Sequence, residues 1–149
     1  MQGDLRCIDL QKQFGTVKAV NGVSFHVSPG EVVGLLGPNG AGKTTVLRML
    51  SGILTPDAGQ VLAGGYDMKE DPLAAKRQIG FLSGDTQLYQ RLSPRELLLY
   101  FGELYEIPAD QARQRTAQLI EGLDMGTFAD RPCDTLSAGQ KQRANIARA

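Results

Sequence analysis

The chain has 149 residues, enough for one domain with a real core that buries on the order of two-thirds of its surface. Its 16 Lys and Arg balance 16 Asp and Glu, and a formal charge of zero excludes the general positive field that attracts nucleic acid or an anionic membrane. No apolar run approaches the ~20 residues of a membrane span and no leader pattern precedes the first motif, so we expect a soluble, intracellular protein.

The chain begins with segments typical of strands. Residues 4–10 alternate polar and apolar side chains, and a second extended segment covers 19–27. A Ser-Pro-Gly turn then leads into residues 31–36, whose aliphatic side chains predict a buried strand. Between the first two segments, Phe14 precedes a flexible Gly15, and periodicity alone leaves open whether its ring is buried in the core or stacks on a base.

Residues 37–45, Gly-Pro-Asn-Gly-Ala-Gly-Lys-Thr-Thr, match the phosphate-binding pattern G-x-x-x-x-G-K-[ST] at every fixed position. Glycines let such a loop turn its backbone N–H groups inward, where they bind anions. Lys43 would supply the mobile charge for the β- and γ-phosphates, and the Thr44 hydroxyl would ligate Mg²⁺. The apolar run after Thr45 predicts a helix whose N-terminal end faces the same phosphates. This order of strand, loop and helix makes an accidental match the weaker interpretation.

Short strands and helices are predicted to follow. Residues 60–63 and 78–82 have the composition of strands, and between them Asp71 caps a short helix that begins with Pro72. Together with the N-terminal strands, these segments predict an α/β core whose N-terminal portion is antiparallel.

The next region is predicted to be helical. A capping box at 93–96 precedes apolar residues at helical spacing. A second helix is expected over 109–122, and the candidates for its buried side are Ala112, Ala117, Leu119 and Ile120. We therefore expect an α/β core over about residues 1–92, a helical lobe over about 93–135 and a last segment over 136–149.

The last segment opens with Leu-Ser-Ala-Gly-Gln at 136–140 and continues as a helix from around Gly139. Ser137 can cap this helix, because its side-chain oxygen can accept hydrogen bonds from first-turn N–H groups. A Ser-Ala-Gly sequence at a helix start also leaves backbone donors uncovered, so a second anion site is an equal alternative to a plain cap.

The phosphate loop followed by residues 136–143 resembles the ATP-binding subunit of ABC transporters. The resemblance covers the whole chain, since residues 20–25 also match the strands that lead into the Walker A loop of that family. It implies a P-loop NTPase core with an antiparallel N-terminal β subdomain and an appended helical lobe. It also implies that the chain is truncated before the Walker B strand and the catalytic glutamate, so we expect these residues alone to hydrolyse no ATP.

The resemblance also implies roles for individual residues. Phe14 matches the aromatic residue that stacks on adenine, and residues 136–140 match the signature L-S-G-G-Q with alanine in place of its first glycine. The implied ATP contacts are Phe14, Val20, Gly37, Asn39, Gly40, Ala41, Gly42, Lys43, Thr44 and Thr45. The implied contacts to ATP of the opposite subunit are Ser137, Ala138, Gly139 and Gln140. The family pairs its ATP-binding subunits head to tail, as a homodimer or with a second such subunit, and the helical lobe meets a membrane-spanning permease subunit.

One position departs from the family pattern. Gly84 stands where the family has its Q-loop glutamine, and glycine cannot ligate Mg²⁺ through a side chain. Gln87, three residues later, is the candidate replacement. The surrounding residues 83–96 resemble the sodium-export subgroup of these ATPases.

The expected function is therefore an ATP-hydrolysing subunit at the inner face of the cell membrane, which drives transport, with ion or drug export as candidates. One alternative is a soluble member of the same superfamily that acts outside transport, and the zero net charge weighs against a nucleic-acid partner for it. A second alternative is a module that binds ATP without turnover. A small-molecule kinase with the same loop would leave residues 136–143 unexplained.

Overall fold

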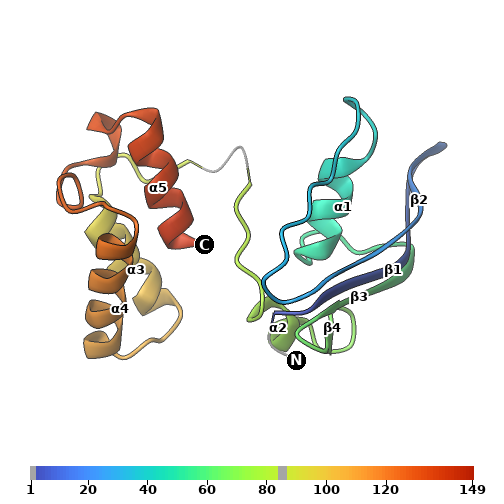
Figure 1. Ribbon diagram of the computed structural model, residues 1–149, viewed down its shortest axis with the longest axis horizontal. Helices are drawn as coiled ribbons and strands as arrows, with labels where there is room; N and C mark the ends of the chain where they lie inside the picture. The colour runs from blue at the N-terminus through green and yellow to red at the C-terminus, as the bar shows by residue number, and fades with distance from the viewer. Residues whose placement is uncertain (1–2, 84–86) are drawn as a thin grey trace. The chain divides into compact units, whose positions relative to one another are not determined.

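The computed structural model describes residues 3–83 and 87–149. They form two compact units, a first unit that ends at Phe81 and a second unit that begins at Leu82 (Figure 1). Within the described part of the chain, no helix is both long and apolar enough to cross a bilayer.

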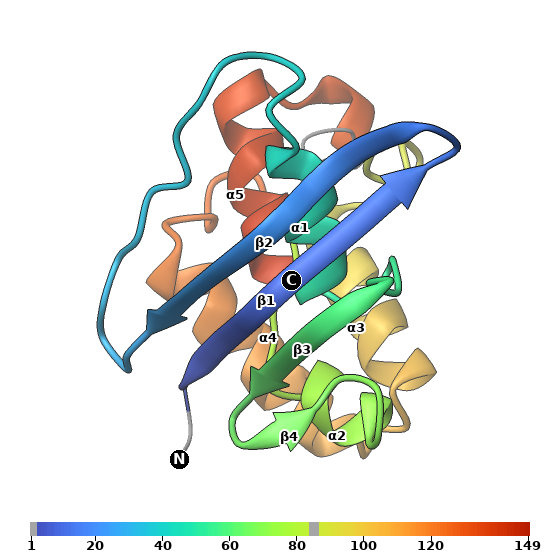
Figure 2. The ribbon, with the colours of Figure 1, turned by 90° about the vertical axis from the view of Figure 1, so that its right-hand side faces the viewer.

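The first unit is built on a four-stranded antiparallel sheet in the order β2-β1-β3-β4 (Figure 2). The strands are β1 (Leu5–Phe14), β2 (Val17–Val27), β3 (Ala58–Ala63) and β4 (Tyr66–Asp67). β1 and β2 form a hairpin that turns at Gly15, whose φ of 56° is left-handed. The strands expected at residues 4–10, 19–27 and 60–63 are confirmed, and the hairpin strands run longer than expected.

One helix covers a face of this sheet. Helix α1 (Lys43–Leu50) lies behind the sheet in Figure 2 and presents Val46, Met49 and Leu50 to it, a spacing that puts all three on one side of the helix. They join Cys7, Leu10, Val20 and Val61 of the strands in the buried core of the unit. The short helix α2 (Pro72–Lys76) follows β4, and the Asp71 side chain accepts a hydrogen bond from the Ala74 N–H at 3.1 Å, as its sequence predicts.

Two predicted strands are wrong. Residues 31–36 and 78–82 contain no strand, and the side chains of Val32 and Leu36 are 97% and 92% exposed. A strand needs a neighbour for its backbone hydrogen bonds and cover for its apolar faces. The described strands pair only among themselves, so residues 31–36 run as an extended connection from β2 to the phosphate loop. Apolar composition indicates that a segment tends to be buried, but it does not show whether a neighbouring strand is available to pair with that segment.

The second unit consists of helices. They are α3 (Pro94–Leu104), α4 (Ala109–Gly122) and α5 (Ala138–Arg148), with the 3₁₀ turn η1 (Cys133–Thr135) before α5. Their core includes the fully buried side chains of Leu97, Met125, Phe128 and Cys133. All three helices were predicted, and α4 has the predicted bounds.

The buried side of α4 differs in part from the prediction. Ala112, Thr116 and Ile120 are buried at a regular spacing of four residues, whereas Ala117 is exposed. The prediction named only apolar residues, but the direction of the side chain around the helix decides burial. A Cβ added to Gly102 of α3 would lie 3.0 Å from the Cβ of Ala112 in α4. Glycine at position 102 therefore permits the close packing of α3 on α4.

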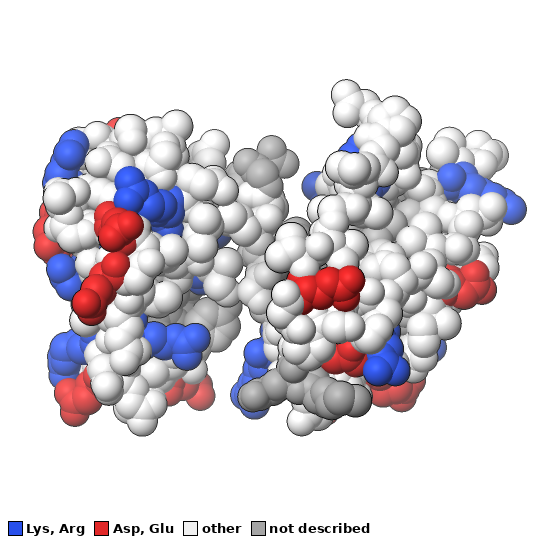
Figure 3. Space-filling model, in the orientation of Figure 1, with Lys and Arg blue, Asp and Glu red and all other residues white. Residues whose placement is uncertain are grey.

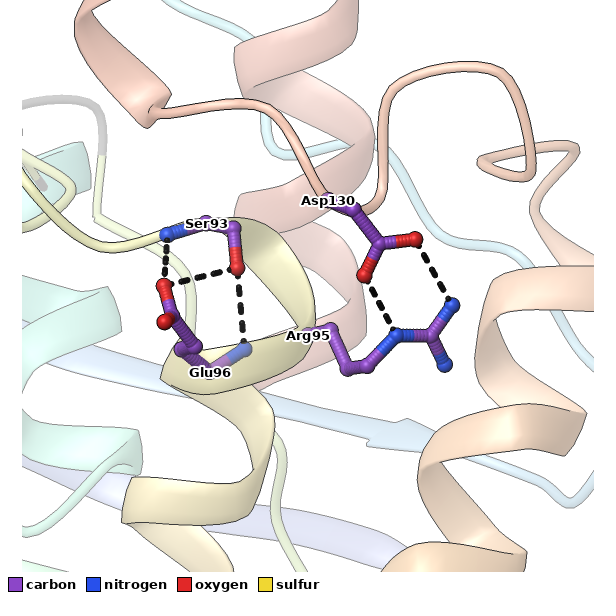
Figure 4. Close-up of polar contacts among 4 residues, drawn as sticks. All are labelled: Ser93, Arg95, Glu96 and Asp130. Atoms are coloured by element: carbon purple, nitrogen blue, oxygen red, sulfur yellow. Dashed lines mark hydrogen bonds and ion pairs between the residues drawn. The ribbon is translucent and has the colours of Figure 1, made fainter.

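The predicted capping box opens α3 (Figure 4). The Ser93 hydroxyl accepts from the Glu96 N–H at 3.3 Å, and the Glu96 carboxylate accepts from the Ser93 N–H at 2.8 Å. Beside it, Arg95 donates two hydrogen bonds to Asp130, at 2.7 and 3.1 Å, and ties α3 to the segment after α4. Donation by the Ser93 backbone lowers the pKa of Glu96, and the Arg95 guanidinium lowers the pKa of Asp130.

These shifts predict acid sensitivity of the second unit. Because both carboxyl groups have lowered pKa values in the folded state, their contribution to stability is present above their ordinary values of 4.5 and 3.8 and is lost as the pH falls below them. Denaturant unfolding of the wild type and of Glu96→Gln across pH should show the variant less stable near neutrality and the two proteins converging in acid. A stability difference that stays constant with pH would contradict the role of the Glu96 charge.

Candidate functional site

The phosphate loop lies between the extended connection and α1. Gly40 and Gly42 have φ values of 82° and 85°, in the left-handed region that side chains disfavour. The Ala41 N–H donates to the Pro38 carbonyl at 3.3 Å and closes a turn inside the loop. Gly42 occupies the N-cap position of α1 and offers no side-chain cap, so the helix presents first-turn N–H groups to the loop. An anion placed here would meet both these donors and the positive end of the helix dipole.

Lys43 reaches back across the loop. Its ammonium donates to the carbonyls of Gly37 and Pro38, both at 2.7 Å. These bonds hold the positive charge inside the loop and close the loop around it. Phosphate oxygens are stronger partners for an ammonium than neutral carbonyls, so a phosphate bound in the loop would compete with these carbonyls for Lys43.

Gly42 is required for a reason that the sequence pattern does not reveal. A Cβ at this position would lie 2.3 Å from the Ala19 carbonyl oxygen of β2 and 3.4 Å from a methyl carbon of Val20. The loop therefore rests directly on the backbone of β2. Val20 is itself only 6% exposed and lies in the core beneath the loop, so its side chain supports the loop from the inside.

The other predicted nucleotide contacts of this unit lie at its surface. Asn39, Ala41 and Thr44 are exposed, and Thr45 is half-buried in the first turn of α1. Phe14 ends β1 with half of its side chain exposed, which answers the open question of whether its ring belongs to the core. The hairpin turn and the phosphate loop lie toward the same end of the unit in both views (Figures 1 and 2).

Residues 136–140 form the start of α5 in the second unit. Ser137 and Gln140 make a reciprocal capping box, with the Ser137 hydroxyl accepting from the Gln140 N–H at 3.3 Å and the Gln140 side chain accepting from the Ser137 N–H at 3.0 Å. The predicted cap is therefore present. Ser137 and Ala138 are exposed, and a Cβ on Gly139 would meet nothing within 4 Å, so this helix end is open to solvent.

Arg143 holds this helix in place. Its guanidinium donates to the Asp124 carbonyl at 3.0 Å and lies 5.3 Å from the ring centre of Phe128. In the sequence, Arg143 is only the last residue of the Lys-Gln-Arg segment that follows residues 136–140, and its partners become visible in the fold alone.

The remaining predicted site residues are those expected to contact Mg²⁺. Gly84 lies outside the described residues, and Gln87 is exposed. Among the residues that the structure describes, no group of three or more His, Cys, Asp or Glu side chains could hold a metal ion. The Thr44 hydroxyl at the start of α1 suits Mg²⁺ bound together with a nucleotide, because Mg²⁺ accepts few protein ligands beside phosphate oxygens and water.

The charge distribution agrees with the balanced composition. On the face drawn in Figure 3, positive and negative side chains are interspersed over both units, with no broad area of one sign.

Similarity to known proteins identifies the family of this chain. A model of the ABC transporter family matches residues 20–149. The chain belongs to the ABC transporter family. Its matched residues include the phosphate loop and the open start of α5.

Curated relatives carry names that agree with this. The linearmycin resistance ATP-binding protein LnrL of Bacillus subtilis is 36% identical over 142 residues, 95% of this chain and 46% of the relative. The ABC transporter ATP-binding protein NatA of the same bacterium is 42% identical over 134 residues, 89% of this chain and 54% of NatA. The daunorubicin resistance ATP-binding protein DrrA3 of Streptomyces coeruleorubidus is 37% identical over 137 residues, 92% of this chain and 43% of the relative. This ABC domain thus spans about half the length of the curated relatives it matches.

Solved structures share the fold. An ATP-binding subunit of an ABC transporter superimposes with a TM-score of 0.82 at 27% identity, covering 97% of this chain and 60% of that one. An ATP-binding cassette of an ABC transporter in its ADP conformation gives a TM-score of 0.80 at 28% identity, covering 97% and 63%. The expected α/β P-loop fold of the ABC ATPases is confirmed.

Proposed function

We propose that the intact protein is the ATP-binding and ATP-hydrolysing subunit of an ABC transporter. The observation that carries the proposal is the loop at 37–45, in which the Lys43 ammonium is bound by the carbonyls of Gly37 and Pro38 at the start of α1. In this proposal the loop and α1 bind the phosphates of MgATP, Thr44 ligates Mg²⁺, and the exposed ring of Phe14 stacks on adenine. Gln87 serves as a further Mg²⁺ contact in place of the Q-loop glutamine.

These residues hold the nucleotide and stabilise charge. As the γ-phosphoryl group is transferred to water, negative charge spreads over its oxygens, where the Lys43 ammonium opposes it. Mg²⁺ held by the Thr44 hydroxyl would supply further positive charge there. We assign no base for the attacking water among these residues, since no apolar run ending in Asp-Glu occurs in the sequence. We therefore propose that this part of the protein alone binds ATP without turnover.

The proposed partners concern the second unit. We infer that Ser137, Ala138, Gly139 and Gln140 contact the γ-phosphate of ATP bound to the opposite subunit of a head-to-tail dimer, because the start of α5 is exposed and offers backbone donors. The helical lobe meets a membrane-spanning permease at the inner face of the membrane. We propose export of an ion or a drug as the process that is driven, and drug export agrees with two relatives that are named for resistance to linearmycin and to daunorubicin.

A pair of serine variants tests this proposal. Ser137 and Ser93 both cap helices of the second unit through capping boxes, so alanine at either position should destabilise the protein similarly, by about 1 kcal/mol. In the intact protein, Ser137→Ala should lower the rate of ATP hydrolysis by at least about tenfold, because a donor to the transferred phosphate is lost. Ser93→Ala should leave the rate near that of the wild type. Equal rates for the two variants would reduce Ser137 to a helix cap and contradict its role at the nucleotide.

A further inference from the structure

The end of β1 is tied to the loop that leaves α1. The Asp57 carboxylate accepts from the Lys12 ammonium and from the Gln13 N–H, both at 2.7 Å. The Asp57 N–H donates back to the Gln11 carbonyl at 2.9 Å, and Lys12 also donates to the Thr55 carbonyl at 2.9 Å. Four hydrogen bonds therefore fix the three residues of β1 that precede Phe14.

One partner of the ion pair between Lys12 and Asp57 is well shielded from solvent. The Lys12 side chain is only 15% exposed, and the Asp57 side chain is 49% exposed. The Lys12 ammonium and the Gln13 N–H lower the pKa of Asp57, so its carboxylate stays ionised through the neutral range. An exposed pair alone would contribute little, but here the same carboxylate also binds backbone, which makes the geometry specific.

The Lys12 ammonium lies over the ring of Phe14, 5.7 Å from the ring centre. Residues two apart on a strand share a face, so β1 itself brings the charge and the ring together. A cation within this range is attracted to the negative face of an aromatic ring. The ring stays half exposed, held by the cation and by the fixed backbone rather than by burial.

We propose that Lys12 and Asp57 are positioning residues for the ring of Phe14 in the nucleotide site. This inference rests on the proposed function, in which that ring stacks on adenine. The turn at 55–57 follows α1, whose other end carries the phosphate loop. Helix α1 therefore connects the two parts of the proposed nucleotide site. The phosphates lie at its N-terminal end, and the loop after its C-terminal end carries Asp57, which fixes the strand that holds the adenine-stacking ring.

The test compares two probes that share the phosphates but not the base. In the intact protein, Lys12→Met and Asp57→Asn should weaken binding of MgATP by about 3-fold to 10-fold and change binding of magnesium tripolyphosphate by less than about twofold. Lys12→Arg should restore MgATP binding, since it keeps the charge and the donors. Lys18→Met is the matched control, because Lys18 lies opposite Gln13 on β2 and is exposed. It should bind both probes as the wild type does.

The variant Phe14→Ala separates failure of this inference from failure of the proposed function. If Phe14→Ala binds MgATP as tightly as the wild type, the adenine contact itself is wrong. A second outcome is that Phe14→Ala weakens binding of MgATP but not of tripolyphosphate. In that case, the positioning role is overturned if Lys12→Met and Asp57→Asn bind both probes as the wild type does. It is also overturned if these two variants weaken the binding of both probes equally. In the Phe14→Ala background, Lys12→Met should cause no further loss of MgATP binding, and a further loss of the full single-variant size would also overturn it.

Discussion

In the intact protein, Lys43→Ala should lower the rate of ATP hydrolysis by at least about 100-fold, because the charge that opposes the developing negative charge on the γ-phosphoryl group is removed. The structure adds a second reason for a large effect. The ammonium also joins Gly37 and Pro38, so its loss opens the loop that it now closes. Steady-state hydrolysis and equilibrium binding of MgATP should both be measured, and both should be impaired.

A lysine in the same unit provides the control. Lys18→Ala removes one positive charge from an exposed position on β2 and should hydrolyse ATP at the wild-type rate. If Lys43→Ala retained hydrolysis comparable to that of Lys18→Ala, the assignment of the loop to phosphate binding would be refuted.

Gly42→Ala should damage both stability and nucleotide binding. The new Cβ would lie 2.3 Å from the Ala19 carbonyl oxygen and would sit on a backbone with φ of 85°, so both strain and steric overlap oppose the native loop. The combined cost should be about 2 kcal/mol or more, and the backbone shift that relieves it moves the first-turn N–H groups of α1. Denaturant unfolding should report the first effect and MgATP affinity the second.

The variant Gly40→Ala separates the effect of backbone strain from the effect of steric overlap. Gly40 has nearly the same φ, 82°, but a Cβ there would meet nothing within 4 Å. Its alanine variant should lose only about 1 kcal/mol and should bind MgATP more tightly than Gly42→Ala does. If the two variants were equally stable, the close approach of the loop to β2 would not be what makes glycine necessary at position 42.

Local physics explains which parts of the fold the sequence predicts. The caps at Asp71, Ser93 and Ser137 were predicted because a cap depends on residues a few positions apart. The first strand of the hairpin could be predicted because alternation of polar and apolar side chains is itself local. The bounds of α4 follow for the same reason.

Features that depend on distant partners were missed. Residues 31–36 have the composition of a buried strand but no described neighbour to pair with. The contact between Lys12 and Asp57 joins residues 45 positions apart, and the need for glycine at 42 comes from the backbone of β2. The sequence pattern identified the chemistry of the phosphate loop, whereas the supports of that loop and of Phe14 required the fold.

The central claim is that the phosphate loop of one subunit and the signature segment of another act on the same ATP. Introducing Asn39→Cys and Ala138→Cys together in the intact protein tests it most directly, because both positions are exposed whereas the native Cys7 and Cys133 are buried. With MgATP and a mild oxidant, disulfide-linked species of two chains should form, and they should be absent from either single variant and from the same protein carrying Lys43→Ala. Failure to cross-link while MgATP is bound, or equal cross-linking without nucleotide, would contradict the composite site.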